Sequence, residues 1–258
     1  MRKKMIVGYV REAFVQYGLT VPIELEIASY PHMLITGASG SGKSQTLLFL
    51  IGKLLQSNPD IAIYLCDFKN SEDFSFMEGY AHYYAGKECY EGIMEYYQHF
   101  SNVRANRTLH GKRRYVLICD EYPAFINYLQ MKDKREKTKL ANDVLGAISE
   151  ILMLGRGIAF GCWLLTQRAD STLFANGARD NFMVVIGLGR MSKEQKGMVF
   201  TGQEIPDEIL GVGEGLLLAD GKELVTVKFP LIDNTSDWKE HILHILINAD
   251  HNGTDIAP

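Results

Sequence analysis

The sequence predicts an α/β fold with a mostly parallel central sheet and helices on both of its faces. Short apolar runs, which suit strands buried on both sides, recur along the chain, and segments with apolar residues at helical spacing lie between them. The 258 residues, 47% of them hydrophobic, are enough for one large domain with a substantial core. The clearest unit is Pro31–Thr36, an apolar run that leads through a glycine-rich loop into a helical pattern over Gln45–Leu55.

The other elements follow in chain order. Val21–Ile27 alternates apolar and acidic residues, as an edge strand or a hairpin would. Further strands are expected at Ile61–Cys66, Tyr115–Cys119, Phe160–Leu165, Phe182–Ile186 and Gly215–Ala219, with Leu224–Phe229 pairing with the last as a hairpin across Asp220-Gly221. Helices are expected at Gln45–Leu55, ending near Asn58-Pro59, and at Tyr90–Arg107, Lys139–Leu154 and Asp237–Asn248, with a charged loop before Lys139.

The glycine-rich loop Gly37–Ser44 fits the phosphate-binding pattern G-x-x-x-x-G-K-[ST]. Its position between a strand and a helix is the context that the pattern requires. Its glycines let backbone N–H groups converge on phosphate oxygens at the helix N-terminus. We therefore expect ATP as the ligand, with Lys43 reaching the β- and γ-phosphates and Ser44 holding Mg²⁺. The expected nucleotide-binding residues are Gly37, Ala38, Ser39, Gly40, Ser41, Gly42, Lys43, Ser44 and Gln45.

A second acidic element is expected beside this loop. Tyr115–Cys119 is an uninterrupted apolar run that ends in Asp120 and Glu121. In parallel sheets ligands bind at the carboxyl ends of the strands, so these carboxylates should lie near the phosphates. Asp120 is the expected Walker B ligand of Mg²⁺, and Glu121 is the expected general base for the attacking water. The adjacent glutamate also favours the ATPases that carry an additional strand over the G proteins.

Composition places the chain in the cytoplasm. No apolar run approaches the ~18 residues of a transmembrane helix, and the N-terminal apolar stretch is too short for a signal peptide. The four cysteines include no C-x-x-C pair, and three of them (Cys66, Cys119 and Cys162) fall in apolar, strand-like runs. We expect a reducing compartment and no direct membrane insertion.

Several separate stretches together resemble the motor domain of FtsK/SpoIIIE DNA translocases, in the wider group that includes HerA helicases and conjugative coupling proteins. The resemblance spans roughly residues 20 to 230, and the block that runs from Arg156 to the Thr-Gln-Arg sequence is its most specific part. The matching stretches are Pro31–Ile35 with the P-loop, Cys66–Lys69, Asp120-Glu121, Gly155–Phe160 followed by Thr166–Arg168, and Gly213–Leu218.

The resemblance implies a RecA-like P-loop NTPase core that hydrolyses ATP in a homo-hexameric ring and translocates DNA. It divides the chain into an N-terminal extension with an edge hairpin (1–30), the ATPase motor domain (31–232) and a C-terminal helix with a frayed tail (233–258). Gln167 is then a sensor of the γ-phosphate or the attacking water, or simply the cap of a strand-end loop. Arg156 lies where family members carry an arginine that points to the next subunit, although a solvated arginine at a helix end is the competing interpretation. Arg168 is either structural or the trans-acting finger in its place.

The chain departs from the family at two loop positions, where Phe68 and Ala169 replace prolines. Neither position supplies a ligand atom, so we expect altered loop stiffness and unaltered chemistry. We expect the flanks to contain none of the membrane helices, linker and winged-helix domain of the cellular family members. We expect a stripped motor of the kind that conjugative elements, plasmids or phages encode, or one piece of a larger chain, with a membrane-anchored or relaxase-type recruiting partner.

The substrate is the most open question. The net charge of −4 disfavours a globally nucleic-acid-binding surface, but in a ring only the pore touches DNA. Two basic patches, His110–Arg114 and Lys132–Lys139, are candidates for contact with DNA phosphates, and the second should form a loop shortly after Asp120. Either patch could instead be a solvated surface. Three function classes compete: a translocase for double- or single-stranded DNA, a type VII secretion-type ATPase that acts on protein, and a degenerate ATPase that serves as a scaffold.

Overall fold

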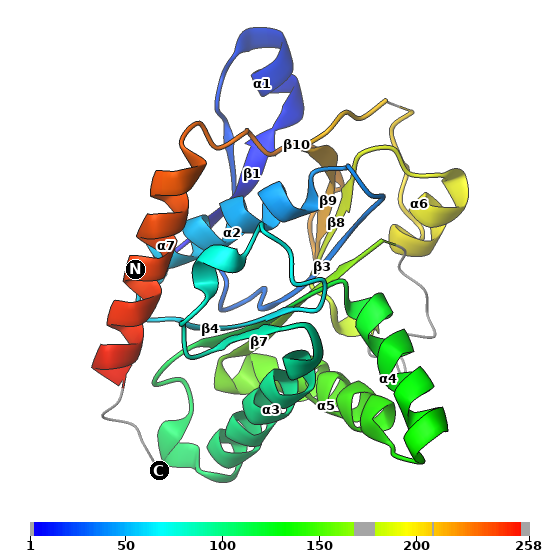
Figure 1. Ribbon diagram of the computed structural model, residues 1–258. Helices are drawn as coiled ribbons and strands as arrows, with labels where there is room; N and C mark the ends of the chain where they lie inside the picture. Colours follow the sequence, from blue (N-terminus) through cyan, green and yellow to red (C-terminus); the bar gives the residue numbers. More distant parts are fainter. Residues whose placement is uncertain (1–2, 168–178, 208, 254–258) are drawn as a thin grey trace.

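The computed structural model describes residues 3–167, 179–207 and 209–253, and within them ten strands form one mixed sheet (Figure 1). The strands are β1 (Met5–Val10), β2 (Pro22–Leu25), β3 (His32–Gly37), β4 (Ala62–Asp67), β5 (Tyr83–Ala85), β6 (Tyr115–Asp120), β7 (Phe160–Thr166), β8 (Val184–Leu188), β9 (Glu214–Ala219) and β10 (Val225–Lys228). Their order across the sheet is β2-β1-β10-β9-β8-β3-β7-β6-β4-β5.

The sheet has a parallel part and an antiparallel part. From β8 through β5 each strand runs parallel to its neighbours, whereas β9, β10, β1 and β2 continue the sheet in antiparallel fashion. The predicted mostly parallel sheet and the predicted β9–β10 hairpin are therefore confirmed. One strand, β7, lies between β3 and β6, so the structure has the additional strand that the adjacent Asp120 and Glu121 indicated.

The helices form a layer on each face of the sheet (Figure 1). They are α1 (Arg11–Tyr17), α2 (Lys43–Ser57), α3 (Cys89–Ala105), α4 (Tyr122–Glu136), α5 (Leu140–Leu154), α6 (Lys193–Val199) and α7 (Thr235–Gly253). One apolar core forms around α2 and α7, and the other around α3, α4 and α5. Successive residues of β3 alternate between them, with Leu34 in one and Met33 and Ile35 in the other. This alternation explains why the strand is apolar throughout.

The segment after Asp120 corrects one prediction. We expected Lys132–Lys139 in a loop because of its charge, but α4 continues to Glu136. The helix buries Tyr122, Phe125, Ile126 and Leu129, which follow one another at helical spacing. The charged residues are simply the solvated end of this helix, and only residues 137–139 connect it to α5.

At the N-terminus, β2 lies at the edge of the sheet, within the predicted edge segment Val21–Ile27. Its partner β1 was not predicted. Gly8 of β1 has φ 139°, and a Cβ there would lie 2.3 Å from a methyl of Val227 in β10. Between β1 and β2 the chain projects from the body of the molecule as α1 (Figure 1).

The terminal helix α7 is fixed against α2 by a fitted aromatic contact. The indole Nε1 of Trp238 donates a hydrogen bond to the carbonyl oxygen of Leu48 (3.0 Å). The ring fits against Gly52, where a Cβ would approach it to 2.2 Å. Lys53 lies over the same ring, 5.4 Å from its centroid. None of the helices in the described ranges is long and apolar enough to cross a membrane.

Candidate active site

The predicted site residues meet at the carboxyl ends of the parallel strands, with one exception. The P-loop follows β3, Gln167 follows β7, and Asp120 and Glu121 stand at the end of β6. In-register pairing brings Thr36 beside Thr166, and Asp67 at the end of β4 beside Asp120. The sheet topology therefore assembles the site from four strands. The exception is Arg156, which lies at the other end of β7.

The P-loop is built to receive a group that accepts hydrogen bonds. Gly42 has φ 95°, a conformation that favours glycine, and it ends the loop where α2 begins. The Lys43 ammonium donates hydrogen bonds to the carbonyl oxygens of Gly37 (2.7 Å) and Ala38 (3.2 Å). The Ser41 hydroxyl is buried and has no partner among the described residues. A lysine and an unpaired hydroxyl at a helix N-terminus fit the phosphates of a nucleotide.

Lys43 also lies near Glu121 and Asp120, whose charges affect its pKa. Burial lowers the pKa of its ammonium group, while the Glu121 and Asp120 carboxylates oppose that shift. The nearby Lys69, in the Cys66–Lys69 stretch, adds to the lowering. Lys43 is only 9% exposed. Its charge is thus held beside two carboxylates at a site closed to most of the solvent.

Asp120 is the more buried of the two acids. It is 6% exposed, and its Oδ1 accepts a hydrogen bond of 3.0 Å from the backbone N–H of Glu121. Burial raises the pKa of Asp120 to about 6, and the Glu121 and Asp67 carboxylates add to the shift. A divalent cation would offset this repulsion directly. The Asp120 carboxylate and the Ser44 hydroxyl are oxygen ligands of the kind that Mg²⁺ prefers, so these residues fit the role of holding it.

Glu121 and Gln167 are brought together. The Gln167 side-chain amide donates to both carboxylate oxygens of Glu121, each at 3.2 Å. Glu121 itself has φ 51°, an uncommon value for a residue with a side chain, and it occupies the N-cap position of α4 without a side-chain capping bond. The sequence predicts Gln167 as a sensor of phosphate or water, or as a loop cap. The structure places its side-chain amide against the Glu121 carboxylate.

Asp67, in the Cys66–Lys69 stretch that carries the resemblance, is a site neighbour that was not among the expected site residues. It is fully buried at the end of β4, and its carboxylate accepts hydrogen bonds from the backbone N–H groups of Asn70 (3.0 Å) and Ser71 (2.9 Å). Burial raises its pKa despite these bonds. An acid at the end of an apolar strand next to the Asp120 strand was the signal that could have added it to the site.

Arg156 lies far from the other predicted catalytic residues of its own chain. It belongs to the 3₁₀ turn Gly155–Ile158, before β7, whereas Gln167 follows the same strand. A strand of this length spans roughly 23 Å. The Arg156 side chain is exposed, with the exposed apolar residues Met153 and Leu154 beside it. It cannot reach its own P-loop. Arg168 and Ala169 lie outside the described residues.

The two basic patches have different surroundings. In the first, Arg113 is committed to the fold: its guanidinium donates to the Asp250 carboxylate (2.9 Å) and to the carbonyl oxygen of Ala249 (3.1 Å) in α7. In the second, the exposed residues Lys134, Lys137 and Lys139 form no ion pair within the described part of the chain. Lys112 of the first patch is also exposed, but the second patch offers three exposed lysines to a partner.

Comparison with known proteins gives a consistent result. The sequence profile of the FtsK/SpoIIIE family matches residues 12–165. The Ftsk domain-containing protein YdcQ of Bacillus subtilis (strain 168) is 29% identical over 190 residues, a match that covers 69% of this chain and 38% of that protein. The chain thus spans about two fifths of the length of this curated relative.

Solved structures share the fold. The pCW3 conjugation coupling protein TcpA, in a monomer form with ATPγS, superposes with a TM-score of 0.70 at 19% identity, covering 95% of this chain and 71% of that one. The cytoplasmic domain of the type VII secretion ATPase EccC of Thermomonospora curvata superposes with a TM-score of 0.69 at 21% identity, covering 95% of this chain and 31% of that one. The fold is that of a RecA-like P-loop ATPase.

Proposed function

The chain belongs to the FtsK/SpoIIIE family of P-loop ATPase motors, and from that premise we propose that it moves DNA through a homo-hexameric ring. The setting that we propose is a mobile element, conjugation, or chromosome or plasmid transfer. A recruiting partner of the membrane-anchored or relaxase type would deliver the DNA to the ring.

The observation that carries the proposal is the course of α4. The helix begins at the residue after Glu121 and ends in the basic segment Lys132–Lys139. The predicted hydrolytic site and the exposed lysines thus lie at the two ends of α4, roughly 22 Å apart. Phe68, beside Asp67, packs against Phe125 and Tyr128 of α4, with ring centroids 5.3 and 5.5 Å apart. A structural change at the nucleotide site would therefore be transmitted to the basic end of α4.

The basic end suits a nonspecific grip on nucleic acid. Arg135 is paired with Glu136 at 2.7 Å, an exposed contact that contributes little to stability. Lys134, Lys137 and Lys139 remain free of ion pairs within the described residues and can contact phosphate. Such contacts are independent of sequence and sensitive to salt, as a translocase requires.

We assign the chemistry to the residues at the carboxyl ends of the strands. The P-loop backbone and Lys43 would bind the phosphates, and Ser44 and Asp120 would hold Mg²⁺. Glu121 would take the proton of the attacking water, with Gln167 fixing its orientation. A positive charge opposite the transferred phosphoryl group would come from Arg156 of a neighbouring subunit, because Arg156 is out of reach in its own chain. The site is then complete only in the ring.

The test is an ATPase assay with double-stranded DNA, single-stranded DNA or neither, combined with light scattering after size-exclusion chromatography. We expect one form of DNA to stimulate turnover. Changing Lys134, Lys137 and Lys139 together to alanine should abolish the stimulation and leave basal turnover intact. The matched control changes three exposed lysines elsewhere, Lys87, Lys193 and Lys222.

Two results would contradict the proposal. Equal stimulation of the triple variant and its control would mean that the end of α4 does not contact DNA. If neither form of DNA raises turnover, whereas an unfolded polypeptide does, the chain acts on protein, as the type VII secretion interpretation holds. Absence of ATP turnover under all of these conditions would favour a scaffold.

A further inference from the structure

The P-loop strand β3 has a parallel neighbour on each side. On one side lies β7, which is followed by Gln167 of the candidate site, and on the other side lies β8. Gly37 at the end of β3 pairs with Leu188 at the end of β8, and a Cβ on Gly37 would approach the carbonyl oxygen of Leu188 to 2.9 Å. The residues that follow β8 therefore lie at the end of the sheet where ligands bind. Arg190 is the second of these residues.

The chain contacts the P-loop directly before Arg190. Gly189 has φ 65°, and a Cβ there would lie 3.1 Å from the Cβ of Ser41. The backbone N–H of Gly189 donates to the carbonyl oxygen of Glu214 (2.7 Å), and that of Gly213 donates to the carbonyl oxygen of Ser41 (3.1 Å). The end of β8, the P-loop and the start of β9 are thus joined to one another.

The chain after Arg190 is fixed as well. Met191 is 9% exposed, and the Ser192 hydroxyl accepts a hydrogen bond from the backbone N–H of Gln195 (3.1 Å) at the start of α6. The backbone of Arg190 is therefore held on both sides, whereas its side chain is exposed. A ligand would have to order only this side chain, which lowers the entropic cost of binding.

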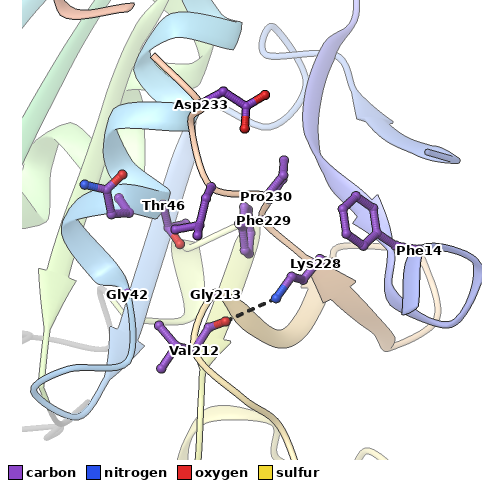
Figure 2. A pocket seen from close by; sticks show the side chains of 11 residues that line it. Phe14, Gly42, Thr46, Val212, Gly213, Lys228, Phe229, Pro230 and Asp233 are labelled. Atoms are coloured by element: carbon purple, nitrogen blue, oxygen red, sulfur yellow. Dashed lines mark hydrogen bonds between the residues drawn. The ribbon is translucent and has the colours of Figure 1, made fainter. Parts of the chain in front are cut away.

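The charge of Arg190 is not neutralised within the described part of the chain. Two other cations near this loop, Arg11 and Lys228, pair with the Glu214 carboxylate at 2.7 and 3.5 Å. Lys228 also donates to the carbonyl oxygen of Val212 (3.2 Å), beside the pocket drawn in Figure 2. Arg190 forms no ion pair and no side-chain hydrogen bond with any described residue. Its guanidinium therefore keeps the planar set of donors that suits phosphate oxygens.

We propose that Arg190 binds the phosphate chain of the nucleotide held by its own subunit. The proposal rests on the proposed ATPase function and adds a phosphate-contacting residue on the β8 side of the P-loop. Its role differs from that of Arg156, which lies at the opposite end of the strands. Arg190 acts in cis, whereas Arg156 would act in trans.

The first test measures the affinity of the full chain for ATP and for inorganic tripolyphosphate, each with Mg²⁺, by calorimetry. Arg190→Ala should weaken the binding of both ligands about tenfold, because a charge-assisted hydrogen bond to phosphate is lost. Both ligands are affected because the contact is to phosphate and involves no base. Arg190→Lys keeps the charge without the planar fork, so it should restore part of the affinity.

Control variants separate this role from a general one. Lys193→Ala removes an exposed cation three residues further on and should change neither affinity. Lys43→Ala should weaken both ligands. The urea midpoint of Arg190→Ala should equal that of the wild type, because the side chain is exposed and bonded to no described residue.

The second test decides whether Arg190 acts in cis. Arg190→Ala and Glu121→Gln subunits are mixed, and ATP turnover is measured at an ATP concentration well below the dissociation constant of the wild type. Every site in a mixed ring then lacks either Glu121 or Arg190, so the mixture should show only the residual turnover of the Arg190→Ala subunits. A return of activity would mean that Arg190 serves the neighbouring subunit, which would overturn the assignment.

Three binding results would also overturn it. Unchanged affinity of Arg190→Ala for both ligands, with weakened binding by Lys43→Ala, would remove Arg190 from the site and leave the P-loop assignment standing. A loss of affinity for ATP alone would mean that Arg190 does not contact phosphate. Failure of the wild type to bind either ligand would overturn the proposed ATPase function and the role of Arg190 with it.

Discussion

The two ends of the parallel strands differ in how complete they are. At the carboxyl ends, Lys43, Asp120, Glu121 and Gln167 lie at one site, and Gln167 is bonded to Glu121. At the amino ends, Arg156 is exposed, with apolar neighbours and no phosphate site within its reach. The carboxyl ends thus bring the predicted site residues together within one chain, whereas Arg156 would need a second copy of the chain to reach a phosphate site.

The same two ends also contain buried titratable groups with opposite responses to pH. Burial raises the pKa of Asp120 to about 6 at the carboxyl end. At the amino end, burial and the charge of Arg156 lower the pKa of His32 to about 4, and neither ring nitrogen has a partner among the described residues. Lowering the pH should therefore remove the buried charge of Asp120 at the carboxyl end, which favours the fold. It should also favour protonation of His32 at the amino end, which opposes the fold.

The largest expected effect tests the need for a second chain. Arg156→Ala should leave ATP binding nearly intact and lower turnover about 10³-fold, because an arginine inserted beside the transferred phosphoryl group stabilises its developing charge by that much. Two measurements check this: the steady-state rate of ATP hydrolysis and the equilibrium affinity for ATP. Specific activity of the wild type should also rise more than linearly with protein concentration.

Mixing two inactive variants is a second test of the need for a second chain. In mixed rings of Arg156→Ala and Glu121→Gln subunits, some interfaces pair an intact Glu121 with an intact Arg156, so part of the activity should return. A constant specific activity across protein concentrations, with no rescue in the mixture, would mean that the carboxyl ends work alone in a monomer.

The next effect tests the carboxyl ends themselves. Glu121→Gln should retain ATP binding and lose turnover at least ~10²-fold, because an amide cannot accept the proton of the attacking water. Pre-steady-state hydrolysis and equilibrium binding measure the two quantities. Near-normal hydrolysis by this variant would place the general base elsewhere.

A smaller effect concerns stability at the carboxyl ends. Asp120→Asn should raise the free energy of unfolding by about 2–3 kcal/mol at pH 8 in EDTA, because a buried and repelled charge is removed. The folded protein holds the Asp120 proton more tightly than the unfolded chain. The gain should therefore shrink as pH falls from 6 toward 4. Urea titrations at the two ends of this pH range would show it, and a gain that grows with acid would contradict it.

The smallest effect concerns the amino ends. His32→Phe should stabilise the fold by about 2 kcal/mol at pH 5 and by less at pH 8. The unfolded chain binds the His32 proton near pH 6.5, and the folded protein binds it only near 4. Stability carried by neutral His32 is therefore lost as pH falls through this window. Phenylalanine fills a similar space without a proton to bind, and a variant with the acid sensitivity of the wild type would refute the assignment.

Elements with strong periodicity or a motif could be predicted from the sequence. The strands of the parallel part except β5 were expected from their apolar runs, and the P-loop and Asp120 from their motifs. Strand β5, of three residues, is too short to show a period. Helix α6 carried a readable signal that was missed: the Ser192 and Gln195 side chains form a capping box. No helix was predicted between Glu121 and Lys139, so α4 was missed as a whole. Its charged end indicated a loop, and its buried residues all lie within 122–129.

The candidate site also has a part that the sequence predicts and a part that it does not. The phosphate-binding residues are contiguous in sequence, so a motif finds them. A pocket beside the P-loop is lined by Phe14, Val212 and Leu231 among others. Phe14 lies about 200 residues before the other two, and no sequence pattern connects them. Their meeting depends on β1 and β10 pairing across the sheet, which only the tertiary structure reveals.

The course of α4 has a mechanical consequence. If α4 moves as one rigid body, its 15 residues make a lever roughly 22 Å long that would pivot near Glu121, whose backbone has φ 51°. A rotation of about 10° at the fulcrum would sweep the lysine-bearing tip through roughly 4 Å. That travel is comparable with the 3.4 Å rise between successive nucleotides along a DNA strand. On the proposed function, a small rotation of α4 at Glu121 would thus move its basic end by about the spacing of one nucleotide.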